Sequence, residues 1–146
     1  MRPSTGSRII AALLLLSLQA PAGAKEVNFD EVLKSGNYML QIGESEKAVA
    51  FFANKTKKYP SSGACHTALG RALKRLGKLD QAKEEFRVSM EVEPAYADGF
   101  YEFGVLSESD KQWAQAAEAF EKYIELKPDN AQRRTIEDRI KYCKAQ

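Results

Sequence analysis

Small, aromatic and proline positions recur along this chain at one fixed spacing. One glycine, one alanine, one phenylalanine and one proline position are each filled three times: Gly36, Gly70, Gly104; Ala48, Ala82, Ala116; Phe52, Phe86, Phe120; Pro60, Pro94, Pro128. Each phenylalanine follows its alanine by one turn along the same helix face. Proline ends helices because it lacks the backbone N–H and restricts the preceding residue. The pattern therefore predicts three units, each with a helix, a turn, a second helix and a stop.

The small residues predict how the helices pack. Glycine in the middle of a helix costs about 1 kcal/mol relative to alanine, so a recurring glycine indicates that another helix comes very close. We expect the glycine of the first helix and the alanine of the second to let the two helices of a unit touch. The phenylalanines are expected to fill the space between one unit and its neighbour.

The period and the order of these positions resemble the tetratricopeptide repeat, a unit of two helices with a length of about 34 residues. The repeats are expected at 29–62, 63–96 and 97–130. Residues 131–146 carry Ile136, Ile140 and Cys143 on one apolar stripe, which resembles the solvating helix that follows such arrays. The resemblance implies an all-α, right-handed superhelical array of antiparallel helix pairs, a solenoid of about seven helices, in a single domain over residues 25–146.

The N-terminal segment has the order of a secretory signal peptide. Residues 1–24 begin with a stretch that holds two arginines, continue with an apolar run over residues 9–20 and end in Pro-Ala-Gly-Ala. Cleavage is expected before Lys25. The apolar run is shorter than the roughly 20 residues of a membrane-spanning helix, so no transmembrane anchor is expected after cleavage. We expect an exported protein, either periplasmic in a bacterium or secreted.

Charge narrows the choice of partner. The chain has 22 basic and 20 acidic residues, a net charge of +2, and that excess equals the two arginines of residues 1–24. The remaining chain is neutral, so its composition does not favour nucleic acid. The charge is segregated along the chain, because 97–130 holds eight acidic and three basic residues while 131–146 holds five basic and two acidic residues.

Candidate chemistry is sparse. The chain has a single histidine, His66, beside one of its two cysteines, Cys65, but neighbours on a helix point about 100° apart. His66 aligns with packing positions of the other repeats, so we expect a core side chain there. Cys65 and Cys143 lie two repeat steps apart, beyond the roughly 7 Å Cα limit of a disulfide, and are expected to be free and half-buried. No catalytic residue, metal site or cofactor is expected.

The resemblance implies a concave groove lined by the first helices of successive repeats. By position, the candidate partner-binding residues are Asn37, Arg71, Lys74, Arg75, Asp98, Tyr101, Glu102 and Val105. One subfamily uses a carboxylate clamp to bind chaperone tails, with Lys, Asn, Asn, Lys and Arg at five positions. The same positions here hold Leu33, Asn37, Ala68, Asp98 and Glu102. Only the asparagine is kept and the last two charges are inverted, so chaperone-tail capture is not expected.

Two interpretations of the charged groove residues stay open. The basic residues of repeat two and the acidic residues of repeat three could pair as solvated ion pairs. Alternatively, Arg71, Arg75 and Tyr101 could grip a segment of another protein. We expect a non-catalytic scaffold that binds a protein or peptide. The alternatives are self-association, as an assembling element in a larger envelope complex, and an enzyme that uses Cys65 and His66.

Overall fold

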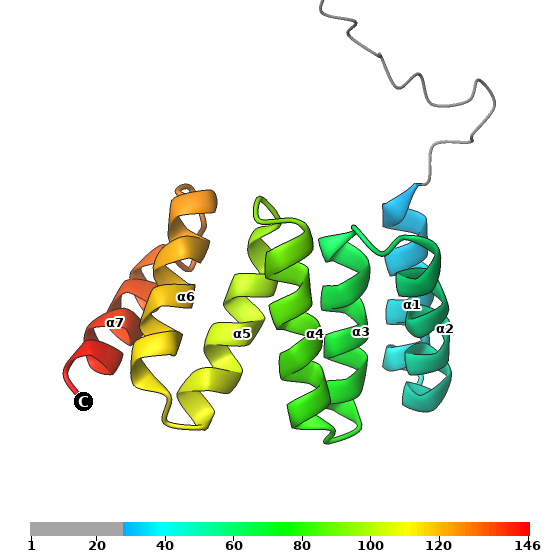
Figure 1. Ribbon diagram of the computed structural model, residues 1–146, viewed down its shortest axis with the longest axis horizontal. Helices are drawn as coiled ribbons and strands as arrows, with labels where there is room; N and C mark the ends of the chain where they lie inside the picture. The colour runs from blue at the N-terminus through cyan, green and yellow to red at the C-terminus, as the bar shows by residue number, and fades with distance from the viewer. Residues whose placement is uncertain (1–27) are drawn as a thin grey trace, which may run out of the picture.

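The computed structural model describes residues 28–146, which form seven α-helices and, within that range, no strand (Figure 1). The helices are α1 (Phe29–Gln41), α2 (Ser45–Lys58), α3 (Gly63–Arg75), α4 (Leu79–Val92), α5 (Ala97–Ser109), α6 (Trp113–Leu126) and α7 (Arg133–Lys144). The expectation of an all-α array of helix pairs is confirmed. The predicted signal peptide, residues 1–24, lies outside the described residues.

The period of the sequence is also the period of the backbone. The helices α1, α3 and α5 begin one repeat length apart, at Phe29, Gly63 and Ala97, and α2, α4 and α6 follow with the same spacing. The tight turn inside each helix pair contains one residue with a left-handed backbone, at Gly43 (φ 83°), Gly77 (φ 73°) and Lys111 (φ 58°). Two of the three turns therefore use the residue that adopts this conformation without steric cost.

The recurring glycines make room for the recurring phenylalanine rings. A Cβ atom built on Gly70 would lie 2.4 Å from Cε1 of Phe86, and one on Gly36 would lie 2.0 Å from Cζ of Phe52. Both rings are fully buried. Each ring sits directly on the glycine of its own helix pair, and it also belongs to a core cluster that spans neighbouring repeats, as expected. The close approach is therefore made by a ring and not by a second backbone.

A small polar contact inside the second repeat lies where the third repeat packs against it. Ser89 of α4 donates to the carbonyl oxygen of Gly63 at 2.9 Å, and its hydroxyl lies 2.8 Å from that of Thr67 in α3. All three residues are buried. A Cβ on Gly99 would lie 2.7 Å from Oγ of Ser89, so α5 can approach this contact only with glycine at that position. The junction fixes α5 beside α3.

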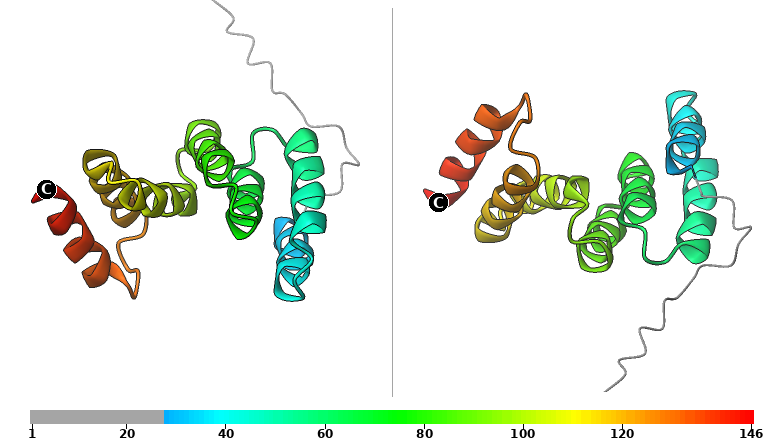
Figure 2. Two further views of the ribbon diagram at one scale, coloured as in Figure 1. Left: turned by 90° about the horizontal axis from the view of Figure 1, so that it is seen from below. Right: turned by 90° about the horizontal axis from the view of Figure 1, so that it is seen from above.

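The helices form two layers that differ in how closely they pack. Along the array, α1 packs against α3 and α3 against α5, whereas no comparable packing joins α2 to α4 or α4 to α6. We call α1, α3, α5 and α7 the inner layer and α2, α4 and α6 the outer layer. Figure 2 shows the helices following one another along the molecule, with α1 and α2 at one end and α7 at the other. Successive repeats therefore meet within the inner layer and where α2 packs against α3 and α4 against α5.

Residues 28–146 lack two features that would indicate other kinds of function. No helix in this range is both long and apolar enough to span a membrane. The same range contains no group of three or more His, Cys, Asp or Glu side chains placed to hold a metal ion.

Candidate functional site

The candidate binding residues lie on the inner layer, in register from helix to helix. The position of Asn37 in α1 recurs one repeat later as Arg71 in α3, then as Val105 in α5 and as Arg139 in α7. The seventh helix therefore continues the register of the repeats. Sequence reasoning did not select Arg139, although the same spacing leads to it.

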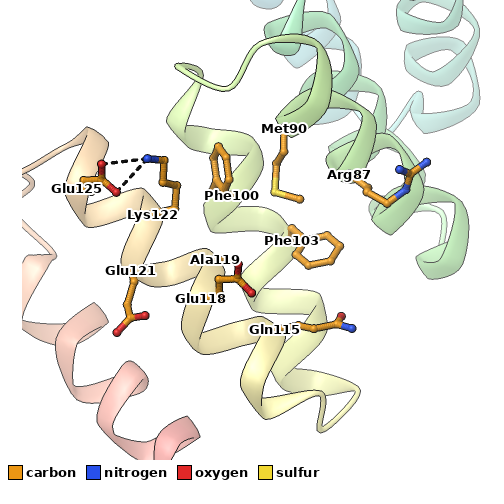
Figure 3. Close-up of a pocket in the computed structure, with 10 residues that line it drawn as sticks. All are labelled: Arg87, Met90, Phe100, Phe103, Gln115, Glu118, Ala119, Glu121, Lys122 and Glu125. Carbon is orange, nitrogen blue, oxygen red and sulfur yellow. Dashed lines mark hydrogen bonds and ion pairs between the residues drawn. The ribbon is translucent and has the colours of Figure 1, made fainter.

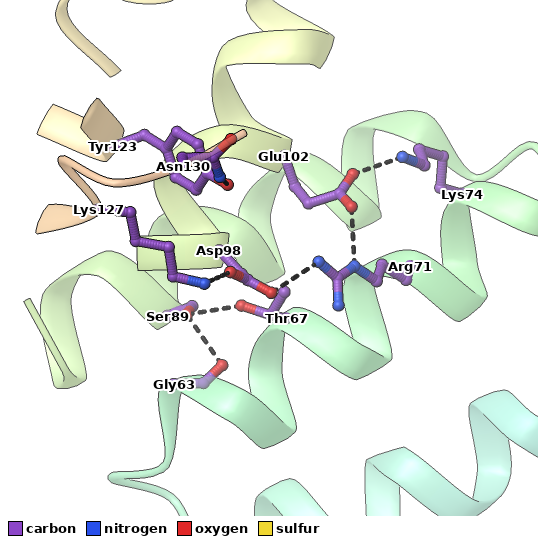
Figure 4. A network of polar contacts seen from close by, with 10 residues as sticks. All are labelled: Gly63, Thr67, Arg71, Lys74, Ser89, Asp98, Glu102, Tyr123, Lys127 and Asn130. Atoms are coloured by element: carbon purple, nitrogen blue, oxygen red, sulfur yellow. Dashed lines mark hydrogen bonds and ion pairs between the residues drawn. The ribbon is translucent and has the colours of Figure 1, made fainter. Parts of the chain in front are cut away.

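Four of the eight candidate residues bind one another across α3 and α5. Arg71 donates from Nε to Oε1 of Glu102 at 2.7 Å and from Nη2 to Oδ2 of Asp98 at 3.1 Å. Lys74 donates to the other oxygen of Glu102 at 2.5 Å. Glu102 is only 7% exposed, and its carboxylate faces both cations (Figure 4). The basic residues of repeat two thus pair with the acidic residues of repeat three, as the ion-pair interpretation expected.

A fifth residue, Lys127, extends this network to the end of α6. Its ammonium group donates to Oδ1 of Asp98 at 2.8 Å (Figure 4). Burial alone would raise the pKa of the Asp98 carboxyl, but hydrogen bonds and positive charge from Lys127 and Arg71 hold that pKa below its ordinary value. Lys127 was not selected from the sequence because it follows a second helix and reaches α5 only through the fold.

Tyr101 and Val105 serve mainly to support the inner layer. The ring of Tyr101 lies 6.1 Å from that of Phe120 and 5.1 Å from that of Tyr123, measured between centroids. The guanidinium of Arg139 lies 6.0 Å from the centroid of the Tyr101 ring. Val105 is half-buried against the same apolar cluster. A partner could touch only the outer edge of these two side chains.

Glu108 binds the terminal helix instead of the basic residues of repeat two. It accepts from Nε of Arg139 at 3.0 Å and forms an ion pair with the same guanidinium. Glu121 of α6 likewise forms an ion pair with Lys144 of α7. Acidic residues of repeat three therefore hold the basic terminal helix within the same chain.

Asn37 and Arg75 are the two candidate residues whose side chains remain accessible to a partner. Both side chains are exposed. Within residues 28–146, neither side chain has an ion-pair partner or a hydrogen-bond partner. They lie on α1 and α3, beside the paired network. The free hydrogen-bonding capacity among the eight candidates is therefore concentrated at the N-terminal half of the inner layer.

Cys65 and His66 do not form a reactive pair. The Cys65 side chain is fully buried, and burial raises the pKa of its thiol. The two ring nitrogens of His66 lie 2.8 Å from Oε2 of Glu85 and 3.0 Å from the carbonyl oxygen of Pro60. His66 was expected in the core but instead makes polar contacts at a partly exposed site. Both cysteines are free, as expected, but Cys65 and Cys143 are buried and not half-buried.

Comparisons with known proteins agree with this geometry. The family described as tetratricopeptide repeat matches residues 64–96. The first such domain of Spaghetti (RPAP3), bound to the HSP90 peptide SRMEEVD, is similar with a TM-score of 0.70 and 18% identity over 80% of this chain and 92% of that chain. The TPR2B domain of yeast Sti1, in complex with pHsp70, has a TM-score of 0.70 and 16% identity, over 80% of this chain and 96% of that chain. The Sgt2 TPR domain of Aspergillus fumigatus has a TM-score of 0.70 and 19% identity, over 86% of this chain and 83% of that chain.

The structural likeness extends over most of the chain, while the family match covers the second repeat. The seven helices of residues 28–146, their constant register and these comparisons together define the fold as a tetratricopeptide helical array. The fold alone does not give a function, which depends on the residues that the surfaces of the array present.

Proposed function

We propose that this protein is a non-catalytic scaffold that binds a segment of another protein on its inner layer. The observation that carries the proposal is the open surface at Asn37 and Arg75, beside a network that holds α3 and α5 in fixed positions. A preorganised surface binds with less loss of conformational entropy. Structures of the same fold that hold HSP90 or HSP70 segments support the proposal.

The ligand of this protein should differ in chemistry from those chaperone tails. Asp98 and Glu102 stand where the carboxylate clamp has basic residues, and their charges are already bound to Arg71, Lys74 and Lys127. The free guanidinium of Arg75 can donate to a carboxylate in two parallel hydrogen bonds, and Asn37 can bind a peptide backbone. We therefore propose a segment that places an acidic side chain near α3 and its backbone along α1.

The location of the protein is part of the proposal. The order of charged, apolar and small residues in 1–24 supports export and cleavage before Lys25. Fractionation of the native cells, followed by N-terminal sequencing, should find the protein outside the cytoplasm with Lys25 as its first residue. A cytoplasmic protein that still begins at Met1 would contradict this part of the proposal.

Photo-crosslinking tests the binding surface. A benzoylphenylalanine introduced in place of Asn37 or Arg75 should form an adduct of defined mass with another protein in the native cells. Asn54, an exposed asparagine on the outer layer, is the matched control and should form no such adduct. Equal adducts at all three positions, or none at Asn37 and Arg75, would overturn the proposal. An adduct with the mass of two copies of the chain would favour self-association instead.

A further inference from the structure

The outer layer contains an apolar groove on the side opposite the candidate binding surface. The groove has a volume of about 640 Å³ and lies where α4, α5 and α6 meet. Figure 3 shows Phe100 and Phe103 projecting from α5 into the space between the other two helices, with Met90 beside them. All three side chains are half-buried. The volume falls in the range of about 300–1,000 Å³ that is usual for binding sites.

Repeat two has an equivalent hollow of about 490 Å³ between α2, α3 and α4, and the two differ at one polar bridge. In repeat two, His66 of α3 binds Glu85 of α4 at 2.8 Å. The equivalent positions of repeat three hold Phe100 and Ala119. They cannot form the bridge, because a phenyl ring and a methyl group have no polar atoms. The groove of repeat three therefore has an apolar floor where that of repeat two has a polar pair, and its volume is larger, about 640 Å³ against about 490 Å³.

The rim of the groove is acidic. Glu118, Glu121 and Glu125 follow one another along α6, where Lys122 is bound to Glu125 and Lys144 of α7 to Glu121. On the opposite wall, Arg87 is held by two glutamates of its own helix. Within residues 28–146, Glu118 is exposed and has no ion-pair partner. An occupant therefore meets an apolar floor and, at the edge of the groove, the carboxylate of Glu118, which is unpaired in the described part of the chain.

We propose that this groove binds an amphipathic helix from another protein, with apolar side chains on Phe100 and Phe103 and lysine or arginine side chains facing Glu118. An apolar helix face fits a groove between helices through side chains at i, i+3, i+4 and i+7. An anionic lipid would be repelled by the same rim. The groove lies on the outer layer, so its partner is distinct from the one proposed for Asn37 and Arg75, and the protein can join two partners.

A synthetic peptide tests the groove. The probe is a fluorescein-labelled helical peptide with leucines at i, i+3, i+4 and i+7 and lysines elsewhere, and its control has the same composition in shuffled order. Fluorescence anisotropy should give a dissociation constant on the order of 10 µM for the probe and at least about tenfold weaker binding for the shuffled peptide. Substitution of Asn37 or Arg75 by alanine should leave the affinity for the probe unchanged.

The decisive variant rebuilds the bridge of repeat two in repeat three. The double substitution Phe100→His and Ala119→Glu introduces side chains that can pair as His66 and Glu85 do. The backbone carbonyl of Pro94 can accept from the new histidine, as that of Pro60 accepts from His66. The probe should lose affinity by at least about tenfold, because a bound polar pair replaces the apolar floor. Circular dichroism should show unchanged helix content.

The reverse exchange keeps the test valid even if the first variant fails to fold. His66→Phe with Glu85→Ala should give the equivalent groove of repeat two the same apolar floor and raise the stoichiometry from one peptide to two. No saturable binding of the probe up to about 1 mM would overturn the proposal, as would equal binding of the shuffled peptide. Unchanged affinity in the folded Phe100→His, Ala119→Glu variant would also overturn it.

Discussion

Replacing Gly70 by alanine should destabilise the protein, although alanine is the better helix former. Gly70 lies in the middle of α3, and a methyl group there would meet three atoms of the Phe86 ring at 2.4, 2.7 and 2.9 Å. Carbon atoms without a bond between them are most stable at about 3.5–4.0 Å. The ring would therefore have to move by about 1 Å. Phe86 is fully buried among core side chains, so the ring has no open space to enter.

The size of the effect follows from two opposing terms. An exposed glycine to alanine change in a helix stabilises by about 1 kcal/mol. Overpacking a well-packed core costs about 1–3 kcal/mol. Because three ring atoms clash at once, we place the cost at the upper end and expect a net loss of about 2 kcal/mol. For a folded unit of roughly 120 residues this corresponds to a fall in Tm of about 8 °C.

Urea unfolding followed by far-ultraviolet circular dichroism measures this effect. The control is the same substitution in a Phe86→Leu background, where the smaller side chain leaves room for the methyl group. There, Gly70→Ala should be neutral or slightly stabilising, which gives a coupling free energy of about 2 kcal/mol in a double-mutant cycle. The reasoning is refuted if Gly70→Ala raises the urea midpoint, or if its effect is the same in both backgrounds.

Three further predictions concern the turn, the ion network and the thiols. Lys111→Gly should stabilise the protein by roughly 0.5–1 kcal/mol. Lys111 has a left-handed backbone, which costs an L side chain about 1–2 kcal/mol, and the greater conformational freedom of glycine in the unfolded chain offsets part of the gain. A lower urea midpoint would contradict this prediction. The folded pKa of Asp98 is depressed, so its stabilisation is present above the unfolded pKa of about 3.9 and is lost as the pH falls through the folded pKa. The stability difference between wild type and Asp98→Asn should therefore be constant from about pH 5 to 8 and shrink below about pH 4, and a difference that does not change with pH would speak against the network. Burial raises the pKa of the Cys65 and Cys143 thiols, so both should react with a thiol reagent at neutral pH far more slowly in the native protein than in urea, and equal rates would disprove their burial.

The sequence predicted the helices well because the repeat is local. The Gly, Ala, Phe and Pro positions recur at a fixed period, and each acts within one helix pair. The contact of each glycine with a phenylalanine ring was not predicted, because a residue pattern does not say which side chain will cover a glycine. The left-handed backbone of Lys111 was also missed. A lysine does not indicate a left-handed backbone, although the repeat period aligns Lys111 with Gly43 and Gly77.

The candidate site was predictable only in part, for a different physical reason. Arg71 and Asp98 lie on neighbouring inner helices, so their pairing could be expected from the register alone. Lys127 reaches Asp98 from the end of α6, and that contact depends on the tertiary path of the chain. The apolar floor of the outer groove depends on two residues, Phe100 and Ala119, that stand where repeat two has a polar pair. Such a hollow appears only when the side chains are packed together.

The central claim is that Asn37 and Arg75 mark a surface that binds another protein. Chemical-shift mapping of the amide groups, with the partner captured by crosslinking at these positions, tests it most directly. The account predicts that the perturbed amides cluster on α1 and α3 around Asn37 and Arg75, and that Arg75→Glu weakens binding by at least about tenfold. Perturbations confined to α2, α4 and α6, with unchanged affinity in Arg75→Glu, would contradict it.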